Sequence, residues 1–284
     1  MNVADKTVLI TGSTDGVGKL VALKLARAGA RTLLHGRNQK KGEAVLHAIR
    51  EQTGNDRLEY FQADFSSLEE VRRMADEIQA KHDRLELLIN NAGIGFTTRG
   101  EMERELSRDG HELRFAVNYL APFLLTYLLI PLIHKSAPAR IVNVSSAGQY
   151  PIDFSDVMLR HNYDGVRAYR QSKLAQVMFT LDLALRLKGS GVTVNCLHPA
   201  TFMNTNMVID SGVKPLSSVE EGADAILHVA TSPDLEGQTG LYFDGKRPGR
   251  ANTQAYDDAA RESLRELSLR LTNLSAPVFD PSAI

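Results

Sequence analysis

Residues 11–18 of the sequence read TGSTDGVG, and they stand between an apolar run, Thr7–Ile10, and a segment of helical period, Gly18–Ala28. The three glycines of this stretch let the backbone turn sharply and approach another group closely. A helix that begins directly after such a turn presents free N–H groups and the positive end of its dipole to an anion. The glycine spacing is G-x-x-x-G-x-G rather than the more common G-x-G-x-x-G, and a turn that binds nothing is the alternative. The strand before it and the helix after it favour a phosphate-binding loop.

Beyond this loop, short apolar runs alternate with segments of helical period along most of the chain. We expect strands at Thr7–Ile10, Thr32–His35, Leu58–Gln62, Leu85–Ile89, Arg140–Val144, Val192–Leu197 and Leu241–Phe243. We expect helices near Gly18–Ala28, Lys40–Gln52, Leu68–Lys81, Glu112–His134, Tyr169–Leu187 and Val219–Thr231. Continuous apolar strands that alternate with helices are typical of a parallel sheet covered on both faces. The pattern predicts an α/β, doubly wound, Rossmann-like fold with seven strands and helices on both faces.

The character of the chain changes near residue 250. We expect one Rossmann-type domain over residues 1–250 and a helical C-terminal tail over residues 251–284. Within the tail, Gln254–Leu271 has the pattern of an amphipathic helix. Its apolar face would carry Leu264, Leu267 and Leu271.

The 284 residues carry a net charge of −1, with 43% hydrophobic and 24% charged residues. Such a balance gives no electrostatic reason to expect a nucleic acid or an anionic membrane as the main partner. Cys196 is the one cysteine, so no internal disulfide can form, and its apolar surroundings predict a buried strand thiol. This fits a reducing compartment, and we expect a cytoplasmic protein.

The N-terminal residues Met1–Lys6 contain no apolar signal region. The most apolar stretch, Tyr119–Ile133, is shorter than the roughly 20 residues that a membrane span needs. Pro122 and Pro131 also interrupt it. We therefore expect a buried or interface helix there, and no integral membrane segment. Histidines, carboxylates and the cysteine do not cluster with the spacing of metal ligands, so we expect no metal.

The second predicted strand ends in His35-Gly36-Arg37-Asn38. In dinucleotide-binding folds, a carboxylate about 20 residues beyond the glycine loop hydrogen-bonds the ribose of NAD and repels a 2′-phosphate. Here no acid is present, and Arg37 can form charge-assisted hydrogen bonds to a phosphate. The sequence therefore favours NADP(H) over NAD(H) as the cofactor.

Tyr169 and Lys173 form the pattern Y-x-x-x-K, which puts both side chains on one face of a helix. A tyrosine that exchanges a proton with a substrate oxygen at neutral pH needs a lowered pKa, and a nearby ammonium favours the phenolate. The pattern alone is common by chance. Three further features support it, namely the segment NNAG at 90–93, the serine pair at 145–146, and Asn118. The first two follow predicted strands, and ligands of open α/β sheets bind at such strand ends.

These motifs, in this order, resemble those of the short-chain dehydrogenase/reductase family from residue 5 to about residue 245. Within that family, RIVNVSSAG (140–148), AYRQSKLAQVMF (168–179) and LHPATFMNTNM (197–207) look most like the retinol-dehydrogenase-like and carbonyl-reductase-like group. The resemblance implies an NADP(H)-dependent oxidoreductase that transfers a hydride between the nicotinamide and a carbonyl or alcohol.

The resemblance also implies roles for the catalytic residues. Tyr169 would be the acid/base, and Ser146 would hydrogen-bond the substrate oxygen. Lys173 would bind the hydroxyls of the nicotinamide ribose and lower the pKa of the tyrosine. Asn118 would hold a water that links the lysine to solvent.

On the cofactor side, the resemblance implies that Asp64 places a carboxylate by the adenine and that Asn91 and Ala92 lie along the adenosine ribose. The full set of expected cofactor-binding residues is Gly12, Ser13, Thr14, Asp15, Gly16, Val17, Gly18, Arg37, Asn38, Asp64, Phe65, Asn91, Ala92, Gly93, Tyr169, Lys173, Pro199 and Ala200.

The chain departs from the family pattern at three places. Pro199-Ala200 replaces the usual Pro-Gly, and the segment after it is one residue longer. The stretch Asp153–Arg167 lengthens the spacing between the catalytic serine and tyrosine, and we expect it to form a wall of the substrate mouth. Asp15 stands in the glycine loop where some NADP-binding members carry a base, which leaves Arg37 as the main phosphate contact.

Most side chains expected around the substrate are apolar, which favours a hydrophobic small molecule. They are Ser146, Gln149, Phe96, Phe154, Tyr163, Phe202, Met203 and Met207, with Tyr150 beside them.

Two other functions remain open at this point. A non-catalytic NADP(H)-binding regulator could use the same fold, although it would not need the four catalytic residues. An epimerase or dehydratase could use the same tyrosine and lysine, but its usual relatives have a longer substrate domain. A homodimer or homotetramer could form by pairing of the helices at 112–134 and 169–187, or the C-terminal helix could cover that surface instead.

Overall fold

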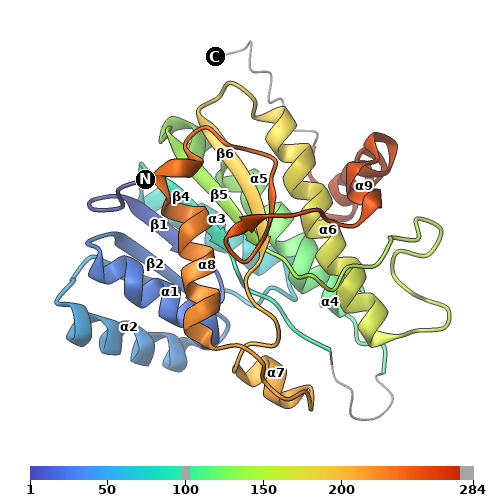
Figure 1. Cartoon of the computed structure of the whole chain (residues 1–284), viewed down its shortest axis with the longest axis horizontal. Helices are drawn as coiled ribbons and strands as arrows, with labels where there is room; N and C mark the ends of the chain where they lie inside the picture. The colour runs from blue at the N-terminus through green and yellow to red at the C-terminus, as the bar shows by residue number, and fades with distance from the viewer. Residues whose placement is uncertain (97–102, 276–284) are drawn as a thin grey trace.

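A single sheet runs through the centre of the protein, whose computed structural model describes residues 1–96 and 103–275 (Figure 1). Its strand order is β3-β2-β1-β4-β5-β6-β7-β8. The strands are β1 (Thr7–Ile10), β2 (Arg31–Gly36), β3 (Leu58–Gln62), β4 (Leu87–Asn90), β5 (Ala139–Val144), β6 (Val192–His198), β7 (Tyr242–Asp244) and β8 (Arg247–Pro248). Strands β1 to β7 are parallel, and the strand order reverses between β1 and β4. The predicted doubly wound α/β fold is thus confirmed.

The prediction of seven strands was wrong by one. Strand β8 is antiparallel to β7, and the two form a tight hairpin at Gly245, whose φ is +59°. Because β8 has only two residues, it is too short to show a periodic pattern in the sequence.

Helices cover both faces of the sheet. On one face lie α1 (Gly16–Arg27), α2 (Gln39–Thr53) and α8 (Val219–Thr231), and on the other α3 (Leu68–Lys81), α5 (Ala121–Lys135) and α6 (Gly165–Arg186) (Figure 1). Alternate strand residues point to opposite faces, so Leu9 and Leu33 join one apolar core while Ile10 and Leu34 join the other. The sequence-based helix boundaries differ from these mainly at the amino ends, where side-chain caps start the helices earlier.

The predicted helix Glu112–His134 exists but is not uniform. It consists of α4 (Leu113–Phe115), a π-helical turn η1 (Ala116–Leu120) and α5. A π turn inserted in a helix is often a mark of a functional site, and this one contains Asn118.

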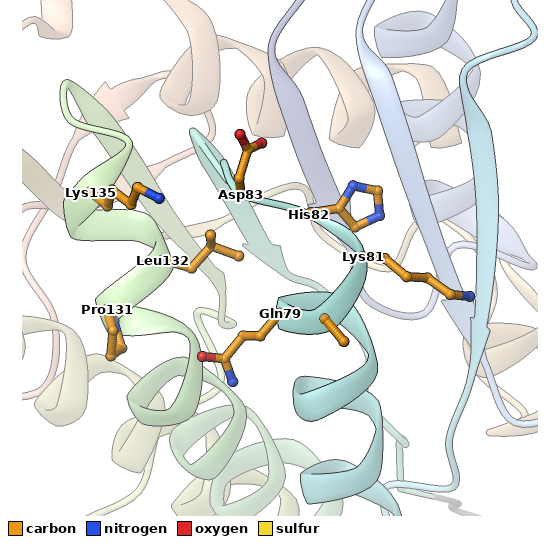
Figure 2. Close-up of a pocket in the computed structure, with 8 residues that line it drawn as sticks. Gln79, Lys81, His82, Asp83, Pro131, Leu132 and Lys135 are labelled. Carbon is orange, nitrogen blue, oxygen red and sulfur yellow. The ribbon is translucent and has the colours of Figure 1, made fainter.

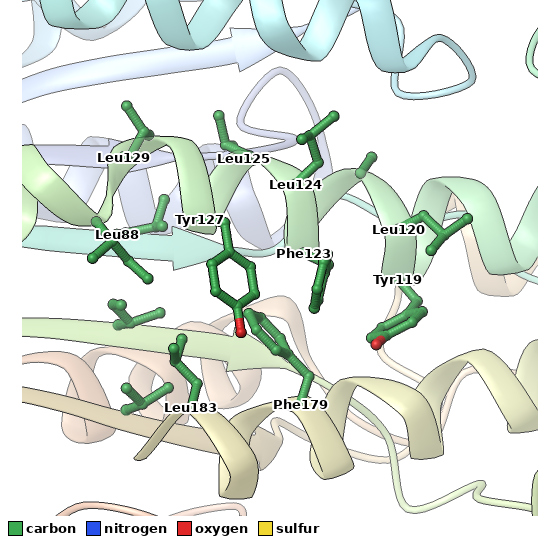
Figure 3. Packing of buried hydrophobic residues seen from close by; sticks show 14 of the residues in the cluster. Leu88, Tyr119, Leu120, Phe123, Leu124, Leu125, Tyr127, Leu129, Phe179 and Leu183 are labelled. Atoms are coloured by element: carbon green, nitrogen blue, oxygen red, sulfur yellow. The ribbon is translucent and has the colours of Figure 1, made fainter. Parts of the chain in front are cut away.

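The helical run Leu113–Lys135 is the one part of the described chain that is long and apolar enough to cross a membrane. Its most apolar window has a mean hydropathy of 1.8, and 89% of that window is buried inside the protein. The rings of Phe123 and Tyr127 pack at a tilt against Phe179 of α6, as Figure 3 shows, with 5.2 Å between the ring centroids of Phe123 and Phe179. It is a core helix here, which agrees with the prediction of a buried helix at Tyr119–Ile133.

The C-terminal tail returns to the body of the protein. A short 3-10 turn η3 (Thr253–Tyr256) precedes α9 (Asp258–Leu271), and Asp257 caps the helix, so the predicted helix Gln254–Leu271 is divided in two. Helix α9 lies along α6 (Figure 1). Leu264 is buried there, and Leu267 and Leu271 pack against the same core. The tail therefore covers the helical surface that the sequence left open for pairing between copies.

Two shorter helices complete the description, α7 (Asn206–Asp210) and the 3-10 helix η2 (Pro233–Leu235). Helix α7 was not predicted. None of its residues is buried, so it has no apolar face that the sequence could have revealed.

Candidate active site

The predicted catalytic residues come from three elements at one edge of the sheet. Tyr169 and Lys173 lie on α6, Ser146 follows β5, and Asn118 lies in the π turn. The helix starts at Gly165 because the carboxylate of Asp164 accepts hydrogen bonds from Val166 N and Arg167 N. Tyr169 therefore lies in the second turn, near the carboxyl ends of the central strands.

The side chain of Ser146 is close enough to the hydroxyl of Tyr169 to lower the pKa of the tyrosine. The Oγ of Ser146 also accepts a hydrogen bond from Gly148 N at 3.1 Å, which orients the hydroxyl. The Tyr169 ring packs against Phe96, with 5.2 Å between the ring centroids, and Nζ of Lys173 lies 5.8 Å from the Tyr169 centroid. The Y-x-x-x-K spacing thus puts Tyr169 and Lys173 on one face of the helix, as predicted, and Phe96 packs against the ring of Tyr169.

The pKa of Tyr169 differs from the expectation. Desolvation raises it above the usual value, and the side chain of Ser146 acts on the pKa in the opposite direction. In this structure, the group that lowers the pKa of Tyr169 is thus Ser146, whereas the sequence assigned that effect to the lysine.

Lys173 is buried with its ammonium between two acceptors. Its Nζ donates to Val144 O at 3.1 Å and to Gln176 Oε1 at 2.9 Å. Desolvation lowers the pKa of Lys173 to about 7, so the amine is close to half protonated at neutral pH. A β-carbon added at Gly93 would lie 3.6 Å from this Nζ, so the glycine keeps the space in front of the lysine open.

Asn118 connects the π turn to β4 and α6. Its Oδ1 accepts from Ile94 N at 2.7 Å, and its Nδ2 donates to Ile94 O at 3.1 Å and to Ser172 Oγ at 3.0 Å. Ser172 in turn donates to Tyr169 O at 2.7 Å. The side-chain amide therefore supports the loop after β4 and the helix that carries Tyr169, and the expected water-holding role stays a prediction.

The glycine loop packs closely against the NNAG segment. Asn91 Nδ2 donates to Thr11 O at 2.9 Å and to Gly12 O at 3.2 Å. A β-carbon at Gly18 would lie 2.3 Å from Gly12 O, and one at Gly12 would lie 2.7 Å from Ala92 Cα. These glycines are therefore needed for the loop to close on β4.

Thr11, which the sequence analysis did not single out, supports the same contact. Its Oγ1 accepts hydrogen bonds from the backbone nitrogens of Asn91 and Ala92, at 2.9 and 3.0 Å. Asn91 and Ala92 are thus held against the glycine loop, so both segments have a defined position for a bound dinucleotide.

His35 is a second residue that the sequence analysis missed. Its Nδ1 accepts a hydrogen bond from Gly12 N at 3.1 Å, its Nε2 lies 3.1 Å from Ala63 O, and its ring stacks on Phe65 with 4.2 Å between centroids. Desolvation lowers the pKa of His35 to about 4, so the imidazole is neutral at physiological pH. The signal available in the sequence was only a polar ring at the end of an apolar strand.

The remaining cofactor candidates include both buried and solvent-accessible side chains. Ser13 and Val17 are buried, and Ser13 Oγ accepts from His35 N at 2.9 Å. Asp64 points outward and pairs with Arg108, with 3.5 Å between Oδ2 and Nη2. Arg37 is exposed at the end of β2. Thr14, Asn38, Pro199 and Ala200 lie in the loops after β1, β2 and β6, at the same edge, and Gly16 is the first residue of α1.

The substrate candidates are not all brought together. A β-carbon at Gly95 would lie 2.8 Å from Met207 Cγ, so Met207 packs against the loop after β4, at the residue before Phe96. Phe154 and Phe202 are each 38% exposed. Met203, in contrast, packs into the core against Gly222 of α8.

Two polar candidates are engaged with the protein itself. Gln149 donates to Ser146 O at 2.8 Å and accepts from Asn252 N at 2.8 Å, so it links the loop that carries Ser146 to the tail. The Tyr163 hydroxyl donates to Glu112 Oε1 at 2.9 Å and accepts from Arg114 Nη1 at 3.0 Å. Both side chains support the walls of the site, which the sequence could not show.

One cavity lies beside this site, and a second lies at the opposite ends of the strands. One of about 330 Å³ adjoins the serine loop and is lined by Ala147, Gln149, Tyr242, Asp244 and Gly249–Asn252. The other, of about 460 Å³, lies between the ends of α3 and α5 beside His82 and Lys135, at the opposite edge of the sheet (Figure 2). Within residues 1–96 and 103–275, no group of three or more His, Cys, Asp or Glu side chains could hold a metal ion.

Comparisons with known proteins agree with this geometry. The sequence pattern of the short chain dehydrogenase family matches residues 6–214. Human retinol dehydrogenase 13 is 37% identical, over 96% of this chain and 86% of its own length. A crystal structure of an uncharacterized protein from Mycobacterium paratuberculosis has a TM-score of 0.78 at 30% identity, and covers 98% of this chain and 97% of its own. The complex of Pseudomonas aeruginosa RhlG with NADP has a TM-score of 0.70 at 26% identity, over 86% of this chain and 96% of its own. On the motifs, the sheet topology and these matches, the chain belongs to the short chain dehydrogenase family and is similar to its retinol dehydrogenases.

Proposed function

We propose that this protein is an NADP(H)-dependent oxidoreductase that interconverts a carbonyl and an alcohol on a hydrophobic small molecule. The observation that carries the proposal is the convergence of Tyr169, Ser146 and Lys173: the Ser146 side chain acts on the tyrosine hydroxyl, and Nζ of Lys173 lies 5.8 Å from the centroid of the tyrosine ring. A substrate oxygen bound between the hydroxyls of Tyr169 and Ser146 would meet a proton donor and a second hydroxyl together.

The cofactor supplies or accepts the hydride, and the protein positions it and handles the proton. In reduction, Tyr169 donates its proton to the substrate oxygen while Ser146 stabilises the developing charge with a hydrogen bond. Lys173 then returns a proton to the phenolate, which its pKa of about 7 allows near neutral pH. A phenol of raised pKa is a competent donor in this direction, whereas oxidation of an alcohol needs the phenolate and is favoured by alkaline pH.

The preference for NADP(H) is supported by the end of β2. Arg37 is exposed there. The next residue is Asn38, whose amide oxygen caps α2, so this position has no carboxylate that would hold a ribose hydroxyl and repel a phosphate. A related structure, that of RhlG, is a complex with NADP.

The preference for a hydrophobic substrate is supported by the mouth of the site. Phe96 packs against the ring of Tyr169, Met207 packs against the adjacent Gly95, and Phe154 and Phe202 keep part of their surface exposed. The curated relative retinol dehydrogenase 13 is named for an apolar alcohol.

The test is the oxidation of NADPH, followed by its absorbance, with a panel of apolar aldehydes and ketones that includes retinal. We expect turnover with at least one of them, and faster turnover with NADPH than with NADH. Tight binding of NADPH without turnover of any carbonyl or alcohol would contradict the enzyme proposal and favour a cofactor-binding regulator.

A further inference from the structure

Asp15 holds three partners at the centre of the glycine loop. Its Oδ1 accepts from Gly16 N at 2.8 Å, and its Oδ2 accepts from Lys41 Nζ at 2.6 Å and from Asn206 Nδ2 at 2.9 Å. The bond from Lys41 is the main reason why the pKa of Asp15 lies below its usual value. The loop thus carries a permanent negative charge, and a lysine from α2 lies directly on it.

This corner of the molecule also contains Arg37. The loop packs on the end of β2, because a β-carbon at Gly36 would lie 2.7 Å from Thr14 Cγ2. Arg37 follows Gly36, and Asn38 then caps α2 by accepting from Lys41 N at 2.9 Å. Asp15 of the glycine loop is thus paired with Lys41 of α2, and Arg37 comes directly after the strand end that the loop contacts.

Stability alone gives little reason for the Asp15–Lys41 pair. Both side chains are about half exposed, at 51% and 49%. Ion pairs between side chains this exposed contribute little to folding, since solvent screens them. An acid in this region would, however, repel a 2′-phosphate on the adenosine ribose. A lysine bound to that acid removes the repulsion and still has donors for a phosphate oxygen.

We propose that Lys41 is a specificity-determining residue for the 2′-phosphate of NADP(H), acting with Arg37 as a second cation. Its ion pair with Asp15 orients the lysine and neutralises the carboxylate that would otherwise favour NAD(H). The three charges leave one net positive charge at the corner. This inference rests on the proposed cofactor, and it explains how a chain with Asp15 in the glycine loop can still select a phosphorylated ribose.

The experiment measures dissociation constants of NADPH, NADH and 2′,5′-ADP for the wild type, Lys41→Ala and the double variant Asp15→Asn/Lys41→Ala. The matched control is Lys40→Ala, which removes the same charge from the adjacent exposed position. We expect Lys41→Ala to weaken NADPH and 2′,5′-ADP by about tenfold or more, the usual effect of losing a bond to a charged group. NADH should change by less than about twofold, because it lacks the phosphate. The double variant should regain part of the loss, because the unpaired carboxylate is gone.

Three results would overturn the inference. Equal losses for NADPH and NADH would show that Lys41 only fastens α2 to the loop. An effect of Lys40→Ala as large as that of Lys41→Ala would show that the loss of general surface charge, and not the position of Lys41, weakens the binding of NADPH. No recovery in the double variant would remove the role of Asp15. A wild type that binds NADH as tightly as NADPH would instead reject the cofactor assignment itself, a result that is visible before any variant is made.

Discussion

The backbone nitrogen of Gly12 donates a hydrogen bond to Nδ1 of His35, at 3.1 Å. This bond joins the first residue of the glycine loop to the second strand, and the other ring nitrogen lies 3.1 Å from Ala63 O beyond the third strand. One neutral imidazole thus links three strands at the point where the cofactor loop begins. The position of the loop depends on β2 and β3 as well as on its own glycines.

Replacing His35 should weaken both cofactors equally. His35→Leu removes the acceptor for Gly12 N, whereas His35→Asn puts an amide oxygen close to the position of Nδ1. We expect the Kd values of NADPH and NADH to rise together in the leucine variant and to recover partly in the asparagine variant, as measured by titration of cofactor fluorescence. A loss confined to NADPH would contradict this positioning role.

His35 should also make the protein sensitive to acid. Its pKa is about 4 in the folded state against 6.5 ordinarily, so the unfolded chain binds the extra proton first as the pH falls. The stabilisation by neutral His35 is fully present above pH 6.5 and is lost as the pH falls towards 4, by about 3 kcal/mol in total. Urea unfolding at several pH values should show this slope, and His35→Asn should reduce it.

Tyr169→Phe should abolish turnover and leave NADPH affinity largely unchanged. The substitution removes only the hydroxyl that transfers the proton, and general acid catalysis typically contributes about 10²–10⁴-fold. Tyr127→Phe is the matched control, because Tyr127 lies in the core on α5 and has no assigned role in the site. Steady-state rates and a binding titration check both variants, and a Tyr169→Phe enzyme with near-normal turnover would reject the assigned role.

Ser146→Ala should move the pH profile of alcohol oxidation to higher pH. The hydroxyl of Ser146 lowers the pKa of Tyr169, so its removal raises that pKa further, and the phenolate needed for oxidation forms only at more alkaline pH. The rate should also fall at every pH, since the substrate oxygen loses a donor. An unchanged midpoint with a lower rate would mean that Ser146 acts on the substrate alone.

Arg37→Ala should weaken NADPH binding much more than NADH binding, because only NADPH carries the phosphate that the guanidinium would hold. Arg50→Ala is the control for general charge, because Arg50 lies in the last turn of α2, the helix that begins shortly after Arg37. Calorimetric titration with both cofactors measures the ratio. Equal losses for the two cofactors would remove the phosphate assignment of Arg37.

The tail should contribute to stability rather than to cofactor binding. Leu264 of α9 is 1% exposed, and Tyr119 Oη and Ser268 Oγ lie 2.6 Å apart beneath the same helix. Leu264→Ala should cost about 2–5 kcal/mol of unfolding free energy, with the Kd of NADPH unchanged. Leu185→Ala, at 63% exposure on α6, should change stability by about 0.5 kcal/mol or less. Thermal and denaturant unfolding measure both, and similar small effects would mean that α9 is loosely attached.

Local pattern determined much of this protein. The alternation of apolar runs and helical periods was enough to predict the doubly wound sheet, because a buried parallel strand must be apolar along its whole length. The spacing of Tyr169 and Lys173 was enough to put both on one helix face, because the helical repeat brings residues four apart together. Arg37 was predictable as an exposed cation at the end of β2, since its position follows from the glycine loop and the strand alone.

Only the tertiary structure decided the contacts between distant segments. His35 supports Gly12, Lys41 neutralises Asp15, Gln149 joins Ser146 to the tail, and Met203 packs into the core instead of facing the substrate. These contacts join segments that are far apart in the sequence, such as the Ser146 loop and the tail, so no local periodicity predicts them. Hydrophobic periodicity specifies which face of an element is buried, but the partner of a polar side chain depends on how whole elements pack. That packing, rather than the motifs, sets the protonation of His35 and Lys173 and the charge around the cofactor loop.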